Sequence, residues 1–144
     1  MEKLEVVGGK KLSGVLKISG SKNASLPILA ASLFSKKKIE LINLPQVKDI
    51  KTMLTLLESL GSKVKKVGKK TIIDNINQKK TEANYNIVRL MRGSFLVLGP
   101  LLAKFGKAKV SSPGGCSIGV RPIDIHLNAL TKLGVKIKIV DGYV

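Results

Sequence analysis

The strongest constraint on the fold of this chain is an internal repeat. Residues 57–65 read LESLGSKVK, and residues 130–138 read LTKLGVKIK. In both copies, leucines at helical spacing lead into a glycine and then into alternating apolar and lysine residues, which is typical of a helix followed by a strand. Gly61 and Gly134 lie 73 positions apart, so the sequence predicts one repeated unit that contains both helices and strands. The predicted fold class is therefore α/β.

The two copies are predicted to share one order of elements. Residues 24–26 open an apolar helix in the first copy, and residues 93–95 open one in the second. A strand, a loop with proline, a second helix and a basic strand follow in each, so we place the units at about 22–75 and 91–144. The separation in sequence between equivalent residues of the two copies grows from 69 positions at the first helix to 73 positions at the glycine. The second copy is therefore four residues longer, and the extra residues fall at the loop 113–116.

Within the first unit, local patterns predict the individual elements. Residues 39–42 read as a strand. Apolar residues between 50 and 60 share one face of a helix, which Gly61 is expected to end. Residues 64–67 and 71–73 then read as the two strands of a hairpin.

The segment before the first unit reads as two short strands. Leu4–Val7 and Val15–Ile18 are mostly apolar and stand around glycines. Ser21 is then predicted to cap a helix, which puts Lys22 and Asn23 in its first turn. The first turn of a helix carries unpaired N–H groups, so it favours anions.

The chain carries a formal net charge of +17, from 26 basic and 9 acidic residues. Such a charge favours polyanionic partners in general. The lysines are scattered, however, and aromatic residues make up only 3% of the chain, so a platform for stacking bases is missing. We expect contact with nucleic acid only non-specifically through charge. A basic nucleic-acid-binding protein remains an alternative that rests on the charge alone.

Cysteine usage and hydropathy point to the cytoplasm. A single cysteine excludes an internal disulfide and fits a reducing compartment. No apolar run approaches the roughly 20 residues of a membrane span. The first residues, Met1–Glu5, lack the apolar segment of a signal peptide. We therefore expect a cytoplasmic protein without a membrane partner. One cysteine and one histidine also make no metal-ligand cluster, so no metal site is predicted.

A glycine-rich loop surrounds the cysteine. Glycines flank Cys116 on both sides, so the backbone there can approach a ligand closely. Arg121 and Pro122 open the next predicted helix, with Asp124 in its first turn. A guanidinium beside a helix start predicts an anion site, and both features favour the thiolate of Cys116. These residues predict a reactive cysteine near an anion, with an inert, buried thiol as the open alternative.

Arginine is rare in this lysine-rich chain. Only three of the 26 basic residues are arginines, at positions 89, 92 and 121. The planar guanidinium binds phosphate or carboxylate at two points, which an ammonium group cannot do. Each arginine is therefore a candidate anion ligand. The alternative is an ordinary surface charge, and this alternative has more weight for Arg89 than for Arg92 and Arg121.

Three separated motifs resemble the UDP-N-acetylglucosamine 1-carboxyvinyltransferase family. The stretch PGGCSIGVRP at 113–122 resembles the active loop of that family. GSKNA at 20–24 resembles its phosphoenolpyruvate-binding motif, and MRGS at 91–94 resembles its nucleotide-sugar-binding stretch. The motifs stand in the order of the family, and the resemblance extends from the first residues to the last.

The resemblance implies an inverted α/β barrel with its helices inside, the enolpyruvyl transferase fold. It is built of repeated βαβαββ-type units, three to a domain, in two domains. This chain matches about two units, so we expect a truncated first domain over 22–144. The strands of residues 1–21 would then belong with the absent second domain. The family's aspartate base and a further arginine also lie in that second domain. We therefore expect the chain alone to be inactive, with a non-catalytic truncated remnant as the alternative.

The implied reaction transfers enolpyruvate from phosphoenolpyruvate to UDP-N-acetylglucosamine and releases phosphate, as the first committed step of peptidoglycan synthesis. No metal or organic cofactor is implied. Cys116 matches the general acid, which fosfomycin alkylates in the family. Lys22, Asn23 and Arg121 match the phosphoenolpyruvate ligands. The nucleotide-sugar ligands match Arg92, Arg121, Pro122, Ile123, Asp124 and Ile125.

Two further assignments narrow the implied site. The shikimate-pathway enolpyruvyl transferase shares the fold but lacks this cysteine loop, so Cys116 and Asn23 argue against it. Asp124 is expected to stay ionised at its helix start beside Arg121, so we assign it to binding rather than to proton transfer. His126 follows on the same helix and is expected to be a helix-face residue with a structural hydrogen bond.

Overall fold

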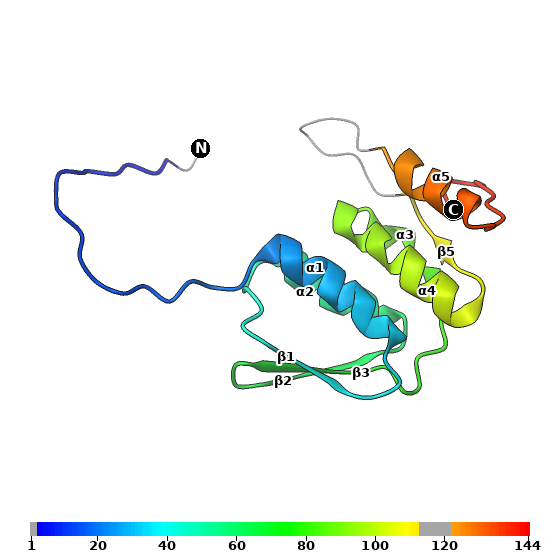
Figure 1. Ribbon diagram of the computed structural model, residues 1–144, viewed down its shortest axis with the longest axis horizontal. Helices are drawn as coiled ribbons and strands as arrows, with labels where there is room; N and C mark the ends of the chain where they lie inside the picture. The colour runs from blue at the N-terminus through cyan, green and yellow to red at the C-terminus, as the bar shows by residue number, and fades with distance from the viewer. Residues whose placement is uncertain (1–2, 113–121) are drawn as a thin grey trace.

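The computed structural model describes residues 3–112 and 122–144. Twelve short elements follow one another along these residues (Figure 1). In chain order they are α1 Lys22–Ala31, the 3₁₀ helix η1 Ser32–Phe34, β1 Ile39–Ile42, α2 Lys48–Ser59, β2 Lys63–Val67, β3 Lys70–Asp74, β4 Glu82–Ala83, α3 Tyr85–Val88, the 3₁₀ helix η2 Arg92–Val97, α4 Leu98–Phe105, β5 Lys109–Val110 and α5 Asp124–Lys132.

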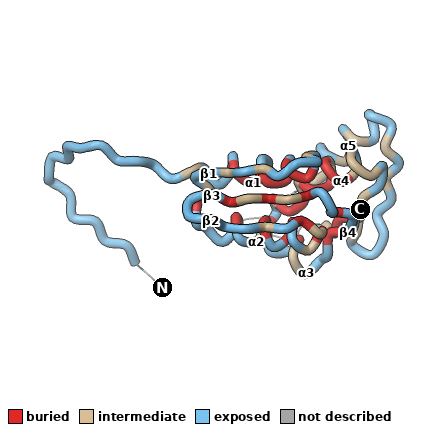
Figure 2. The backbone as a smooth tube through the Cα atoms, turned by 90° about the horizontal axis from the view of Figure 1, so that it is seen from below, coloured by how far each residue is buried: buried red, intermediate tan, exposed pale blue. Residues whose placement is uncertain are grey.

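The first unit is a layer of helices on a three-stranded antiparallel sheet. The strand order is β1-β3-β2, so β3 is central. Helices α1 and α2 lie side by side on one face of this sheet, and the buried residues gather on that side (Figures 1 and 2). The core is aliphatic, as the low aromatic content requires, and Leu29, Leu33, Leu57 and Ile73 are completely buried.

The predicted elements of the first unit are confirmed. Along α2, Ile50, Met53, Leu54 and Leu57 recur at the spacing of one helix face, and all are buried. Gly61 follows the helix with a φ of 103°, a left-handed conformation that glycine adopts without strain. The strands β2 and β3 then form the predicted antiparallel hairpin.

The second unit repeats the strand register of the first. In the first unit, Leu41 of β1 is paired with Thr71 of β3. The offsets of 69 and 73 carry these two residues to Val110 and Val144. Those residues exchange two backbone hydrogen bonds, from Val110 N to Val144 O at 2.8 Å and from Val144 N to Val110 O at 2.9 Å. The internal repeat predicted from the sequence is therefore present in the strand pairing.

Two predicted strands near the N-terminus do not form. Leu4–Val7 and Val15–Ile18 have no strand partner among the described residues, and the segment before α1 extends away from the body with its apolar side chains exposed (Figure 1). A strand exists only when its N–H and C=O groups pair with a neighbour. The assignment of this segment to a second domain stays a prediction.

The basic strand predicted at 135–138 is also not formed. In its place the chain runs irregularly to a bridge between Val140 and Tyr143. This bridge corresponds to the pair Val67 and Lys70 at the tip of the first hairpin. Residues 136–139, which would extend this pairing, form no strand in the described part of the chain.

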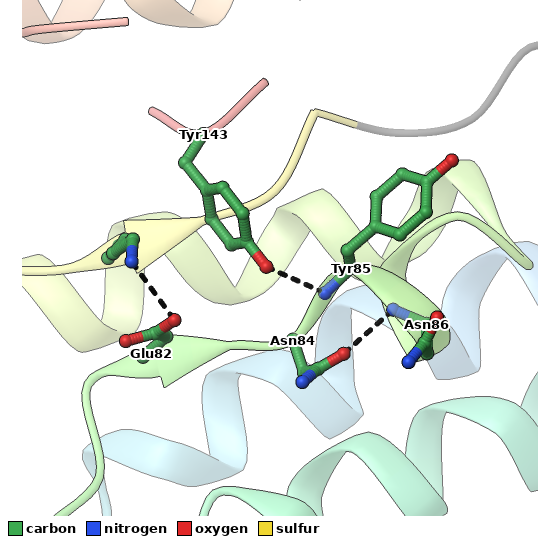
Figure 3. A network of polar contacts seen from close by, with 6 residues as sticks. Glu82, Asn84, Tyr85, Asn86 and Tyr143 are labelled. Atoms are coloured by element: carbon green, nitrogen blue, oxygen red, sulfur yellow. Dashed lines mark hydrogen bonds and ion pairs between the residues drawn. The ribbon is translucent and has the colours of Figure 1, made fainter. Parts of the chain in front are cut away.

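A short parallel pairing joins the two halves of the chain. Strand β4 pairs with β5, with Glu82 beside Lys109, and the sequence analysis did not predict it. Lys109 Nζ lies 3.1 Å from Glu82 Oε1 and 4.6 Å from the centre of the Tyr143 ring. The Tyr143 hydroxyl accepts a hydrogen bond from the backbone N–H of Tyr85 at 3.3 Å (Figure 3). These contacts attach the C-terminal turn to β4 and α3.

Within the described ranges, none of the helices combines the length and the apolar character needed to cross a membrane.

A buried asparagine connects the ends of both helices of the first unit to β3. Asn75 is 1% exposed; its side-chain amide donates to Ser32 O at 2.7 Å and accepts from the Ser62 hydroxyl at 2.5 Å. We predict that Asn75→Ala lowers the free energy of unfolding by about 1–3 kcal/mol, because the buried Ser62 hydroxyl loses its acceptor, while Ser32 O keeps the hydrogen bond from Ser35 N and loses only its second donor. Urea denaturation measures this. The control Asn128→Ala, at an exposed position on α5, is expected to change it by less than about 0.5 kcal/mol. Equal stability of the two variants would contradict the structural role.

Candidate functional site

A cavity of about 360 Å³ lies where α1, α2, η2 and α5 meet. Its lining includes Lys22 and Asn23 from α1, Arg92 from η2 and Ile123 just before α5. These four residues were predicted as ligands, two from the motif at 20–24, one from the motif at 91–94 and one from the run 121–125 that continues the third motif, and the structure brings them to one place. Long stretches of sequence separate the motifs, so their meeting does not follow from any local pattern.

The other predicted ligands are placed differently. Pro122, Asp124 and Ile125 are exposed and stand next to the cavity residue Ile123 without lining the cavity themselves. Cys116 and Arg121 lie outside the described residues. Their assigned roles stay predictions.

The start of α1 is built as the sequence predicts. The Ser21 hydroxyl accepts a hydrogen bond from Ala24 N at 3.3 Å, and Ser25 Oγ donates to Ser21 O at 2.7 Å. This capping fixes the first turn, so Lys22 and Asn23 project from a helix end whose remaining N–H groups carry partial positive charge. The helix end and the Lys22 ammonium therefore both attract an anion in the cavity.

Asp49 is a cavity residue that the sequence analysis missed. It lies in the first turn of α2, and its carboxylate oxygen is 2.9 Å from Lys22 Nζ. The side chains of Lys22 and Asp49 are 47% and 34% exposed, so water screens this ion pair substantially. The sequence shows Asp49 near the start of a predicted helix, but it does not show that Lys22 on another helix is its partner.

The wall opposite α1 is made by η2 and α5. A Cβ at Gly93 would lie 3.0 Å from Leu26 Cδ1, so the absence of a side chain lets η2 approach α1 closely. Phe95 is 5% exposed, and its ring meets that of His126 edge to face, with centres 6.2 Å apart and an interplanar angle of 84°. His126 therefore lines the cavity, and its ring contacts that of Phe95. The structural hydrogen bond expected for His126 stays a prediction.

The charges around the cavity suit an anion. Lys22 and Arg92 contribute two cations against the single carboxylate of Asp49. Within the ranges 3–112 and 122–144, no group of three or more histidine, cysteine, aspartate or glutamate residues could hold a metal ion. The positive excess and the helix start together favour a phosphate or a carboxylate.

Comparison with known proteins identifies the family. The family model for EPSP synthase (3-phosphoshikimate 1-carboxyvinyltransferase) matches residues 6–144. The chain belongs to this family. Two relatives named UDP-N-acetylglucosamine 1-carboxyvinyltransferase, from Pelagibacter ubique and Campylobacter fetus, are 67% and 54% identical to it over 144 residues. The match covers all of this chain and 34% of each relative, so the chain spans about a third of their length. The family resemblance inferred from the three motifs is confirmed.

A solved structure supports the fold independently. The enolpyruvyl transferase NikO from Streptomyces tendae superimposes with a TM-score of 0.75 at 22% identity, covering 94% of this chain and 30% of that chain. At this identity the likeness shows the fold alone. The predicted α/β enolpyruvyl transferase fold, present here in part, is confirmed.

The Lys22–Asp49 pair yields a prediction about anion affinity. Asp49→Asn removes the carboxylate that competes with an incoming anion for Lys22, so inorganic phosphate is expected to bind about fivefold more tightly at low ionic strength. Isothermal titration calorimetry measures the change. Glu58→Gln is the matched control, because Glu58 is exposed near the other end of the same helix and its substitution removes the same charge. An equal gain in both variants would show that Asp49 acts only through the net charge.

Proposed function

We propose that this chain supplies part of the active site of an enzyme that transfers enolpyruvate from phosphoenolpyruvate to UDP-N-acetylglucosamine and releases phosphate. The observation that carries the proposal is the cavity in which Lys22 and Asn23 meet Arg92. Residues that match the ligands of two different substrates line one space, as a transfer between those substrates requires. The names of the 67% and 54% identical relatives support the choice of acceptor.

The proposed chemistry assigns a proton donor to the glycine-rich loop. Cys116 gives a proton to the methylene carbon of the enol, which makes the neighbouring carbon electrophilic. A hydroxyl oxygen of the sugar nucleotide then bonds to that carbon, and a base takes the hydroxyl proton. Loss of phosphate, and of one proton from the new methyl group, restores the double bond in the product. The base belongs to the part of the relatives beyond this chain.

The proposed binding roles follow the charges. Lys22, Asn23 and Arg121 bind phosphoenolpyruvate, whose phosphate and carboxylate match the positive helix start. Arg92 and the run of residues 121–125 bind the nucleotide sugar. Ile123 lines the same cavity as Lys22, which supports a shared boundary between the two substrates.

The acceptor is what separates this proposal from the shikimate-pathway reaction named in the family description. Phosphate release from phosphoenolpyruvate, in the enzyme at the length of its relatives, is expected with UDP-N-acetylglucosamine and not with shikimate 3-phosphate. The reverse preference would overturn the proposal. No phosphate release with either acceptor would favour a non-catalytic remnant.

A cellular role follows from the same proposal. The product would enter peptidoglycan synthesis in the cytoplasm, and fosfomycin would inactivate the enzyme by alkylating Cys116. Non-specific contact with nucleic acid through the net charge stays a prediction.

Cys116 is the only thiol in the chain, so alkylation reports on it without background. We predict a thiol pKa below the ordinary value of about 8.5, because Arg121 and a helix start favour the thiolate. The pH dependence of iodoacetamide labelling measures this pKa, and UDP-N-acetylglucosamine is expected to change the labelling rate. Cys116→Asp should abolish labelling while keeping a proton donor. An ordinary thiol pKa that the nucleotide sugar leaves unchanged would refute the assignment.

Arg121 is predicted to contact both substrates through its two-point guanidinium. In the enzyme at full family length, Arg121→Lys keeps the charge but loses this geometry, so kcat/KM for phosphoenolpyruvate is expected to fall at least about tenfold, or roughly 1.4 kcal/mol. Steady-state kinetics measures the loss. Lys66→Arg, at an exposed position of β2, is the control and should leave kcat/KM unchanged. Equal activity of the two variants would remove Arg121 from the site.

A further inference from the structure

The hydroxyl of Ser94 is buried without a hydrogen-bond partner, alone among the side chains that the structure describes. Ser94 is completely buried in η2, two residues after Arg92 of the cavity lining. A hydroxyl that leaves water without gaining a partner costs free energy, and native structures contain few such groups. The missing partner therefore needs a physical reason.

The internal repeat provides a reference for Ser94. The separation of 69 positions between the first helices of the two units carries Ser25 onto Ser94. In the first unit, the Ser25 hydroxyl donates to Ser21 O at 2.7 Å, and the N–H of Ser25 donates to the same carbonyl at 3.0 Å. Both groups therefore bond four residues back, as in the first turn of an α-helix.

The second unit begins its helix differently. The N–H of Ser94 donates to Met91 O, three residues back, at 3.1 Å. Met91 is extended, with φ −155° and ψ 127°, so the helix begins at Arg92, one residue later than in the first unit. The carbonyl of Leu90 corresponds to that of Ser21, but neither group of Ser94 donates to it among the described hydrogen bonds.

The 3₁₀ form of η2 is long for its type. It covers six residues, whereas runs beyond three or four are uncommon and often mark a point of conformational change. The equivalent residues of the first unit, 23–28, are α-helical. Pro100 of α4 crowds only the carbonyl four residues back, at Leu96, so it does not determine the bonding at the start of η2. The same repeated unit thus adopts both helical forms.

We propose that Ser94 is a positioning residue for Arg92, because the first turn of η2 changes from 3₁₀ to α when the nucleotide sugar binds. In the α form, the N–H and the hydroxyl of Ser94 both donate to Leu90 O, as in the first unit. Residues advance by about 120° around a 3₁₀ helix and by about 100° around an α-helix, so the change turns Arg92 toward the position that Asn23 holds on α1. The inference rests on the proposed function in taking UDP-N-acetylglucosamine as the ligand of Arg92.

The unpartnered hydroxyl lowers the cost of this change. A ligand shifts an equilibrium between two forms only if it contacts them differently, and here the difference is the direction of Arg92. The α form also gains the hydrogen bond that the free form lacks. Ser94→Ala removes that gain together with the unpartnered group, so binding is weakened while the free protein keeps its stability. A hydroxyl with a purely structural role would instead lower the stability when removed.

Two alanine variants separate these roles. Ser94→Ala is expected to weaken the binding of UDP-N-acetylglucosamine about three- to tenfold in calorimetry, and to leave Tm within about 1 °C of wild type or above it. Ser25→Ala is the matched control, because it removes a hydroxyl that already has its partner, and it should lower Tm by about 2–5 °C. An equal fall in Tm in both variants would overturn the positioning role.

NMR on this chain identifies the acceptor of the Ser94 N–H directly, through the coupling that a hydrogen bond transmits from an amide nitrogen to a carbonyl carbon. We expect Met91 as the acceptor in the free protein and Leu90 in the presence of UDP-N-acetylglucosamine at millimolar concentration. Inorganic phosphate serves as a second probe for Arg92. Leu90 as the acceptor in the free protein would contradict the inference.

The outcomes separate this inference from the proposed function. If UDP-N-acetylglucosamine binds and Met91 stays the acceptor, the positioning role is wrong and the proposed function is intact. If UDP-N-acetylglucosamine fails to bind while inorganic phosphate moves the acceptor to Leu90, the positioning role stands and the proposed sugar nucleotide falls. If neither probe changes the acceptor, the inference is wrong at any affinity.

Discussion

The burial of α1 against α2 and η2 is the interaction on which the rest of the structure depends. Leu29 and Leu33, on and just after α1, are completely buried, and each such leucine contributes about 1.5–3 kcal/mol by leaving water. Because α1 contacts α2 in its own unit and η2 in the next, its burial joins the two units. It also fixes the helix start, so the direction of Lys22 and Asn23 follows from the hydrophobic core.

The internal repeat explains why ligands from distant motifs meet. The offset of 69 that relates the first helices of the two units carries Asn23 onto Arg92. Both residues stand at the start of the helical segment in their unit, and both line the same cavity. Packing two copies of one unit side by side thus places two equivalent helix starts on one space. The duplicated scaffold creates a site between units that neither unit holds alone.

Local patterns were sufficient for the first unit, because periodic leucines and Gly61 act within a single helix and its neighbouring strand. They failed where pairing depends on a distant partner. Two-residue strands such as β4 and β5 have no detectable period, and residues 135–138 have the composition of a strand but do not form one in the structure. Asp49 and His126 were missed as cavity residues for the same reason, since their contacts lie between separate helices.

The distribution of charge supports the special status of arginine in this chain. Every ion pair that the structure describes uses a lysine as its cation, and the pair of Lys70 with Glu40 raises the pKa of that lysine through a hydrogen bond. Arg89 lies over the ring of Tyr85 at 5.5 Å. Five of the nine acidic residues, Glu5, Glu40, Asp49, Asp74 and Glu82, thus pair with lysines in the described part of the chain, while Arg92 lines the cavity. The chain has only 9 acidic residues against 26 basic ones, and the cavity lining likewise carries more positive than negative charge, which favours binding of an anion.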